Sequence, residues 1–327
     1  MTGSPSSASA PPAPPPLPQR SGGRIDLRAR LAERPAVLAP MSGVTDAACR
    51  VIAHRLGAGL VVSEMIASDA LAEGRGDMTR RAEGAGVIAP LVIQLAGREP
   101  VWMGLGAKVA QDAGADVIDI NMGCPAKQVT RGASGSALMR DLDHALTLID
   151  AVVAAAEVPV TLKMRLGWDH DTINAPELAR RAEAAGVAVL TVHGRTRCPV
   201  YDGVADARTA LERSGAAAVM VGRAAVGAPW LPGQIADALA GRPITAFDAD
   251  AKAAIALEHF DRTLDLYGDA RGVRIFRKHL AAYASAAPQP RGESQASNLC
   301  RLSHAGAIRD ALSALFNGRI FEVGRAA

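Results

Sequence analysis

Aromatic residues, long apolar runs and paired cysteines are scarce in this chain. Aromatics make up 3% of the 327 residues, and no apolar run reaches the roughly 18 residues of a membrane-spanning helix. The four cysteines (Cys49, Cys124, Cys198 and Cys300) are scattered and form no C-x-x-C pair. That distribution argues against a disulfide framework or a zinc site and suits a reducing compartment. We therefore expect a cytoplasmic protein without a membrane span.

Two common cofactor signatures are missing as well. The seven histidines are dispersed, and neither an H-x-x-x-H pattern nor a paired-carboxylate spacing is present. No G-x-G-x-x-G sequence follows the first expected strand, so the Rossmann dinucleotide fingerprint is absent. We expect no metal site.

The composition that remains fits a compact protein. Apolar residues make up 49% and charged residues 21%, and the net charge is +3. With so small a charge, any nucleic-acid surface must be local. Residues 1–24 hold seven prolines among many Ser, Ala and Gly residues. We expect a disordered tail there, or an over-extended gene start.

From residue 34 onward, short β-branched runs alternate with Ala-rich amphipathic stretches. Glycine with a small residue precedes several of the runs, as at Gly114 and Gly186, where it can end a helix in the left-handed conformation. Repeated β-loop-α units predict a parallel sheet covered by helices. A closed TIM-type (β/α) barrel is the first choice and a doubly wound open sheet the second. The expected strands are 36–39, 60–63, 91–95, 117–121, 160–164, 189–192 and 219–221.

The run from Asp119 to Pro125 is the most informative stretch. An apolar strand ends in polar residues, and Cys124 sits between glycine and proline just beyond it. Glycine allows close backbone approach to a ligand, and proline ends regular pairing. A buried structural cysteine is the alternative reading.

Polar or glycine residues also end several other strands. Each alone could be a surface residue or a cap, but in a barrel such ends converge on one face. Lys163 and His193 directly follow apolar strands, a costly place for a charge without a ligand. The small residues around Gly222 and Arg223 leave backbone N–H groups free for a phosphate. A lysine, a glutamine and a phosphate seat together suit a flavin. The strand-end residues are Pro40, Met41, Ser42, Glu64, Gln94, Asn121, Lys163, Arg165, His193, Arg195, Gly222 and Arg223.

These motifs together resemble the tRNA-dihydrouridine synthases, with the B-type bacterial branch closest. The similarity runs from about residue 24 to about residue 283 and rests on the segments 38–46, 94–97, 119–125, 162–165 and 193–197. The resemblance implies that reduced FMN gives a hydride to C6 of a uracil in tRNA, that a cysteine protonates C5 and that NADPH regenerates the flavin. It suggests a D-loop uridine as the target.

The resemblance also implies roles by motif position. Cys124 resembles the proton donor. The residues that resemble cofactor contacts or their neighbours are Pro40, Met41, Ser42, Gln94, Asn121, Lys163, His193, Gly222 and Arg223. Arg165 and Arg195 would lie towards the tRNA.

The C-terminal part carries a local basic patch. Residues 271–291 contain no acidic residue, and Arg271, Arg274 and Lys278 fall on one helical face. A solvated helix face is the plain alternative. The resemblance implies a helical domain that grips the tRNA backbone through Arg271, Arg274, Arg277, Lys278 and His279. We thus expect a tail at 1–24, an FMN-binding barrel at 25–240 and a tRNA-binding helical domain at 241–327.

One barrel unit is missing from the sequence. The strand at 219–221 begins only 27 positions after the strand at 189–192 ends, which leaves room for one helix and no further strand. We count seven strands where a complete barrel has eight, so the seventh βα unit is absent. Two strand edges would then lack partners, and binding of the FMN phosphate would be weakened.

Three functions remain open at this point. The first is a flavin-dependent tRNA-uridine reductase. The second is a degenerate, FMN-deficient tRNA-binding homologue, which the missing unit favours. The third is a flavin barrel that acts on a small free pyrimidine or enone, which gives the basic helix no role.

Overall fold

The computed structural model of the chain describes residues 25–197, 207–287 and 299–316. The expected tail at 1–24, the segment 198–206 with Cys198, and Arg291 lie outside the described residues. None of the described helices is long and apolar enough to cross a membrane.

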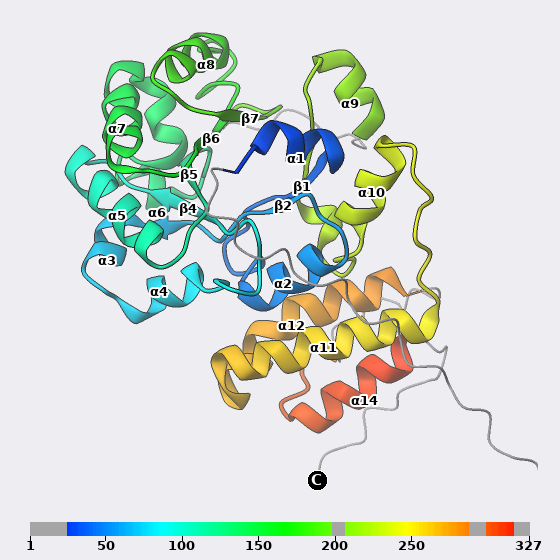
Figure 1. Ribbon diagram of the computed structural model, residues 1–327. Helices are drawn as coiled ribbons and strands as arrows, with labels where there is room; N and C mark the ends of the chain where they lie inside the picture. Colours follow the sequence, from blue (N-terminus) through cyan, green and yellow to red (C-terminus); the bar gives the residue numbers. More distant parts are fainter. Residues whose placement is uncertain (1–24, 198–206, 288–298, 317–327) are drawn as a thin grey trace, which may run out of the picture.

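Parallel strands form the centre of the molecule, and helices surround them (Figure 1). The strands are β1 (Ala36–Leu38), β2 (Leu60–Val61), β3 (Ile66–Ala67), β4 (Val92–Ala96), β5 (Val117–Met122), β6 (Val160–Arg165), β7 (Val189–His193) and β8 (Val219–Val221). They form a sheet ordered β2-β1-β8 and a sheet ordered β3-β4-β5-β6-β7, joined by an isolated bridge between Val62 and Val92. Because the first strand pairs with the last, this is the order of a barrel and not of a doubly wound sheet.

The predicted α/β barrel class with a helical C-terminal region is confirmed. All seven expected strands are present as β1, β2 and β4 to β8, whereas the two-residue β3 was not expected. The glycines that end helices behave as predicted, since Gly114 and Gly186 have φ values of 99° and 104°.

Helices cover the outside of the strands and alternate with them along the chain. Aspartates cap several of them: the side chain of Asp46 accepts a 3.0 Å hydrogen bond from the Cys49 N–H and that of Asp141 a 3.0 Å bond from the His144 N–H. The helices of this part are α1 (Leu27–Glu33), α2 (Ala47–Arg55), α3 (Ser68–Ala72), α4 (Gly76–Ala82), α5 (Pro100–Asp112), α6 (Lys127–Thr130), η1 (Gly135–Arg140), α7 (Leu142–Ala155), α8 (Ala175–Ala184), α9 (Ala207–Ser214), η2 (Arg223–Ala225) and α10 (Leu231–Leu239).

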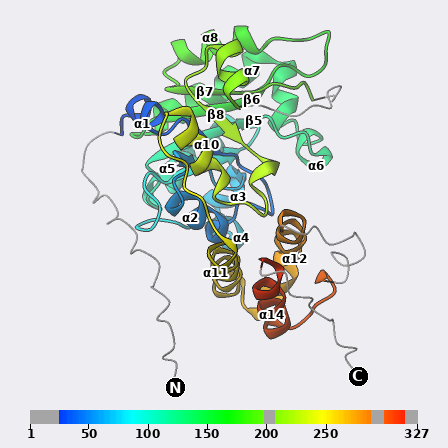
Figure 2. The same ribbon diagram turned by 90° about the vertical axis from the view of Figure 1, so that its right-hand side faces the viewer.

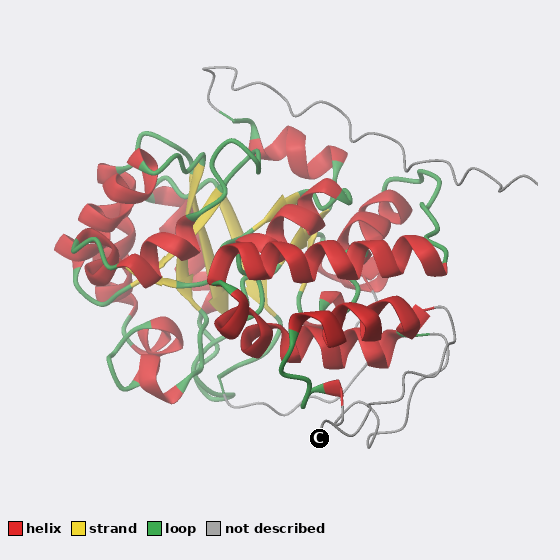
Figure 3. Ribbon diagram, turned by 90° about the horizontal axis from the view of Figure 1, so that it is seen from below, coloured by secondary structure: helices red, strands yellow, loops and turns green. Residues whose placement is uncertain are grey.

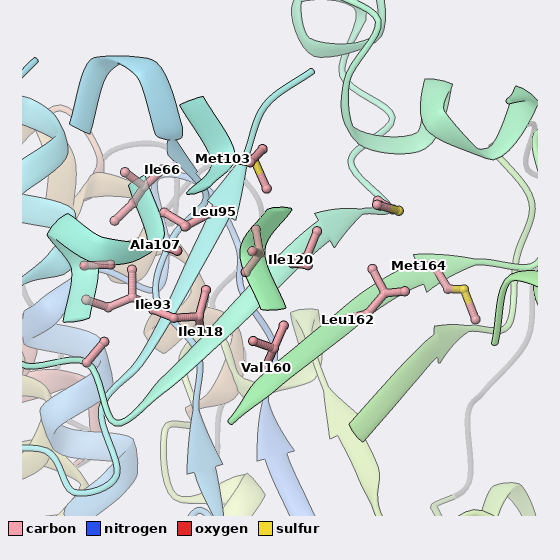
Figure 4. Packing of buried hydrophobic residues seen from close by; sticks show 14 of the residues in the cluster. Ile66, Ile93, Leu95, Met103, Ala107, Ile118, Ile120, Val160, Leu162 and Met164 are labelled. Carbon is pink, nitrogen blue, oxygen red and sulfur yellow. The ribbon is translucent and has the colours of Figure 1, made fainter. Parts of the chain in front are cut away.

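Alternation along the strands decides which side chains enter the barrel. Ile118 and Ile120 of β5 are fully buried in one cluster with Met103 and Ala107 of α5 (Figure 4). Because successive residues of a strand face opposite sides, Asp119 and Asn121 turn the other way. The same rule sends Leu162 and Met164 of β6 outward and Thr161, Lys163 and Arg165 inward.

The barrel is open between β7 and β8. Within the described residues, β7 pairs only with β6 and β8 only with β1. Val192 of β7 is 44% exposed, as expected for an edge strand. The one described helix between these strands, α9, has no buried residue. An opening at this point is what the absence of one βα unit predicts.

Three long helices form the C-terminal region below the barrel (Figures 1 and 3). They are α11 (Ala249–Tyr267), α12 (Asp269–Ala286) and α14 (Ala305–Phe316). Their shared core includes Phe260, Phe276, Tyr283 and Leu312, and Ile52 of α2 belongs to the same cluster. The helical region is therefore packed directly against the barrel helix that follows β1.

Candidate active site

A buried polar network lies under the carboxyl ends of β4, β5 and β6. Asp119 accepts a 2.6 Å hydrogen bond from Nε2 of Gln94 and a 2.5 Å bond from the hydroxyl of Thr161. Asn121 donates from Nδ2 to Oε1 of Gln94 over 2.7 Å. Burial raises the pKa of Asp119, and the hydrogen bonds from Thr161 and Gln94 and the charge of Lys163 oppose that shift. The network fixes Asn121 in one orientation.

Asn121 in turn holds the loop that carries Cys124. Its Oδ1 accepts hydrogen bonds from the N–H of Gly123 over 3.2 Å and of Cys124 over 3.0 Å. On the other side of the loop, the Cys124 carbonyl accepts from the Ser136 N–H over 3.0 Å. Cys124 itself is partly exposed, so its thiol is presented at the strand edge and not sunk in packing. The alternative of a buried structural cysteine does not apply to Cys124.

Arg165 links the Cys124 loop to the loop after β7. Its Nε donates to the Gly123 carbonyl over 2.7 Å and its Nη1 to the Thr196 carbonyl over 2.9 Å. The residue is only 9% exposed. Its guanidinium therefore supports the loops, and it offers little surface to a bound RNA.

Lys163 stands on β6 directly beside Asn121 in the parallel register. Burial lowers the pKa of its ammonium, the charge of Asp119 opposes that shift, and the charge of Arg165 adds to it. Arg165 is bonded to the Gly123 carbonyl and Lys163 pairs with Asn121, so two cations lie next to the loop of Cys124. Among the described residues, no acceptor lies within hydrogen-bond distance of the Lys163 side chain. A half-buried ammonium of this kind suits an anionic ligand.

Further cations gather where β7 and β8 end. His193 is opposite Arg165 in the register, and its pKa is lowered to about 4. Partial burial is the larger cause, followed by the charges of Lys163, Arg165, Arg195 and Arg223. The imidazole is therefore neutral near pH 7 and can donate one hydrogen bond and accept another.

The loop after β1 approaches the loop after β8. A Cβ at Gly222 would lie 3.9 Å from the sulfur of Met41, so the two loops are in contact distance. Met41 is fixed by its own N–H, which donates to the hydroxyl of Thr45 over 2.8 Å. Pro40 is half-buried and Ser42 is exposed, so this stretch offers surface to a ligand.

The same loop is held from two sides. The Gly43 N–H donates to Oε1 of Glu64 over 2.5 Å, and the ammonium of Lys278 from α12 donates to the Gly43 carbonyl. Gly43 has φ of 74°, a left-handed conformation that favours glycine. The helical region thus reaches the strand ends through one lysine.

The basic residues of α12 divide into two groups. Arg271, Arg274 and Lys278 are exposed along one face, as the spacing predicts, while Arg277 is half-buried. The expectation that His279 faces RNA is wrong, because its side chain is 1% exposed and packs against His259 with ring centroids 4.4 Å apart.

Gln94 also differs from its expected role. It is completely buried, and its amide is engaged with Asp119 and Asn121. It supports Asn121 and presents no surface to a cofactor in this structure. Glu64 was expected only as one of the polar strand-end residues. Asp119 and Thr161 were given no role by the sequence, and their inward position on alternate strand residues was the signal that could have found them.

A protein-family model described as "Dihydrouridine synthase (Dus)" matches residues 37–205 and 201–306 of the chain. A probable tRNA-dihydrouridine synthase of Rhizobium leguminosarum bv. phaseoli is 50% identical over 273 residues, covering 76% of this chain and 84% of that protein. The probable tRNA-dihydrouridine synthase of Rhodobacter capsulatus is 48% identical over 296 residues, covering 81% and 91%. The tRNA-dihydrouridine synthase B of Xanthomonas campestris pv. campestris is 43% identical over 284 residues, covering 77% and 84%.

The matches also bear on the opening of the barrel. The two stretches matched by the family model meet at residues 201–205, which lie between β7 and β8. The Rhizobium alignment spans 273 positions, whereas 76% of 327 residues is about 25 fewer. About 25 positions of that relative therefore have no counterpart here, close to the length of one strand and helix.

Proposed function

The chain belongs to the dihydrouridine synthase family, and we propose that it reduces the 5,6 double bond of a uridine in tRNA, with FMN bound at the strand ends and NADPH as reductant. The observation that carries the proposal is the neighbourhood of Cys124 and Lys163. A thiol and an ammonium that makes no hydrogen bond to any described residue stand at the ends of adjacent strands, in a register that pairs Asn121 with Lys163. A proton donor and a seat for negative charge are what reduction of an enone by a flavin requires.

The residues at the strand ends fit a flavin. Lys163, Arg195 and Arg223 form a cationic group around the neutral imidazole of His193, which suits a ligand with a phosphate and an anionic ring. We assign Pro40, Met41, Ser42, Lys163, His193, Gly222 and Arg223 to contact with FMN. Asn121 and, beneath it, Gln94 support that surface through their hydrogen bonds.

Each residue then has a separate task in the reaction. A bound reduced flavin supplies the hydride that C6 of the uracil accepts. Cys124 gives its thiol proton to C5, and Asn121 and Arg165 keep the loop of Cys124 in place while it does so. Lys163 supplies the positive charge that an anionic ring needs next to it.

The helical region provides the second half of the proposal. Arg271, Arg274 and Lys278 give α12 an exposed basic face, and phosphate contacts of this kind position an RNA without reading its bases. Residues 25–240 would thus hold the cofactor and residues 241–327 much of the tRNA. A D-loop uridine as target, suggested by the resemblance to the B-type branch, forms part of this proposal.

A second function is supported by the opening between β7 and β8. Among the described residues, β7 and β8 each lack a second strand partner next to the proposed phosphate seat of the flavin, which favours a tRNA-binding homologue that no longer retains FMN. The intact set of Cys124, Lys163, His193 and Arg223 favours the reductase over this alternative.

Two measurements on the purified full chain distinguish the tRNA-uridine reductase from the alternative functions. We expect the visible absorbance of a stoichiometric oxidised flavin, identified as FMN after release, and dihydrouridine in tRNA incubated with the protein and NADPH. Mass spectrometry of nucleosides from cells with and without the gene identifies the modified uridine. Binding of tRNA without any flavin would select the degenerate homologue. Turnover on free uracil comparable to that on tRNA would select the small-molecule reductase.

A further inference from the structure

Two arginines lie over one tryptophan ring on the rim of the barrel. Trp168 follows β6, and the guanidinium carbons of Arg197 and Arg140 lie 4.7 Å and 5.1 Å from its ring centroid. Arg140 ends η1 in the loop after β5, and Arg197 lies in the loop after β7. Three consecutive βα loops therefore converge on one aromatic ring.

Backbone contacts fix this arrangement. The Arg197 N–H donates to the carbonyls of Gly167 and Trp168 over 3.2 Å and 3.1 Å. The side-chain amide of Asn174 donates to the Met139 carbonyl over 2.7 Å, next to Arg140. The ring and its two arginines are thus held by the loops themselves, and the ring keeps part of its surface exposed.

Neither guanidinium forms an ion pair in the part of the chain that the structure describes. Within the described residues, no carboxylate lies within 4.0 Å of Arg140 or Arg197. The nearest acid in sequence to the ring, Asp169, is occupied in its own turn, where it accepts from the N–H and hydroxyl of Thr172 over 2.9 Å and 2.6 Å. Two guanidiniums stacked on one aromatic ring present both a π surface and positive charge, which suit the base and the phosphate of a nucleotide.

The position fits an RNA that enters the site. The loops after β5, β6 and β7 all leave the same strand edge as Cys124, because parallel strands end together. Figure 2 shows α6, which follows Cys124, and α12 on the same side of the molecule, α6 on the barrel and α12 on the helical region. An RNA gripped by α12 could therefore extend along that side of the molecule to the loops at the barrel rim.

We propose that Trp168, with Arg140 and Arg197, forms an RNA-stacking site on the barrel rim, where an unpaired base stacks against the exposed part of this cation–π group and its phosphate meets the guanidiniums. This inference rests on the proposed function, since it names a contact of the same RNA substrate. The base would be a nucleotide near the target uridine, which must itself leave its stack to reach Cys124.

Substitutions at Trp168 test the stacking. Replacing one aromatic stacking partner of a base weakens binding roughly tenfold, so we expect Trp168→Leu to raise the Kd for unmodified tRNA by about that factor and Trp168→Phe to restore most of the affinity. Trp102→Leu, on α5 and without a nearby guanidinium in the described residues, is the matched control. Flavin content and the unfolding temperature show whether each variant is folded.

Two further readouts keep the test independent of folding. Binding of tRNA should quench tryptophan fluorescence in the wild type, and most of that quenching should vanish in Trp168→Phe. Arg140→Gln, a change at an exposed residue, should weaken binding and lower the salt slope by about one unit. Wild-type affinity in Trp168→Leu, or undiminished quenching in Trp168→Phe, would overturn the site.

Product formation separates this inference from the proposed function. Binding of tRNA that depends on Trp168, in a wild-type protein that makes no dihydrouridine, would keep the stacking site and remove the reductase. Dihydrouridine formation with binding indifferent to Trp168 would keep the reductase and remove the stacking site.

Discussion

Arg165 donates a 2.7 Å hydrogen bond from Nε to the carbonyl of Gly123, the residue immediately before Cys124. Its second bond reaches Thr196 after β7, so one buried guanidinium holds the loops of two strands. The position of the reactive thiol therefore depends on a residue that does not itself react.

The first prediction concerns this support. Arg165→Met should lower the free energy of unfolding by about 1–3 kcal/mol, because two buried carbonyls lose their donor. Alkylation of Cys124 by iodoacetamide should become faster as its loop loosens. Denaturant unfolding and mass spectrometry of the labelled cysteine measure both effects. Arg180→Met, at an exposed position of α8, should change neither; equal labelling rates in the two variants would contradict the assignment.

The second prediction concerns Cys124 itself. Cys124→Ala should keep its flavin content and lose about 10²–10⁴-fold in dihydrouridine formation, the usual contribution of a positioned proton donor. Cys300→Ala, in the helical region, provides the control. Undiminished product from Cys124→Ala would remove the thiol from its assigned role.

The third prediction separates two cations of α12. Arg274→Gln should weaken tRNA binding and reduce the salt slope by about one unit while flavin affinity stays unchanged. Lys278→Gln should also weaken flavin binding, because the Lys278 ammonium holds the Gly43 carbonyl in the loop after β1. Fluorescence titration of apo-protein with FMN, without tRNA, measures the difference. Identical FMN affinities in the two variants would show that Lys278 serves only the RNA.

The fourth prediction concerns pH. Burial lowers the pKa of His259 to about 3, from an ordinary value near 6.5, and its Nδ1 is 3.1 Å from the Tyr283 hydroxyl. Between these two pKa values, His259 therefore binds a proton in the unfolded chain but not in the folded chain. The contribution of His259 to stability is complete above pH 6.5 and is lost as the pH falls towards 3, by about 2 kcal/mol at pH 5.

Variants isolate this contribution from opposing ones. Burial raises the pKa of Asp46 to about 6, so its contribution has the opposite sense: it is complete below about pH 4 and lost as the pH rises through 6. We compare thermal unfolding between pH 7 and pH 5 in the wild type, His259→Gln and the exposed-site control His170→Gln. Only His259→Gln should lose less thermal stability than the wild type between pH 7 and pH 5. Parallel curves for all three would exclude His259 as the cause.

Much of the barrel could be predicted because its signals are local. The alternation that buries Ile118 and Ile120 and turns Asp119 and Asn121 inward is written in consecutive residues. The short spacing between the sixth and last predicted strands agrees with the lack of pairing between β7 and β8 among the described residues. The absence of a whole βα unit stays a prediction. The neighbourhood of Cys124 and Lys163 followed once the strand ends were known to meet.

The exceptions depend on contacts between distant segments. His279 shares a helix with exposed basic residues, and only the packing of α12 on α11 reveals that its ring points to His259. Gln94 ends a strand like its neighbours, but the carboxylate of Asp119 from the next strand takes its amide. The tie from Lys278 to Gly43 joins residues 235 positions apart, a pairing that no sequence periodicity encodes.

The hydrogen bond from Lys278 to Gly43 links the loop after β1 to the basic helix α12. The loop of Gly43 faces the proposed cofactor, whereas Arg274 on the same helix as Lys278 faces solvent. By thermodynamic reciprocity, if a bound flavin raises the association constant of the RNA by some factor, the bound RNA raises the association constant of the flavin by the same factor. Titration of either ligand at fixed levels of the other therefore measures one shared coupling constant.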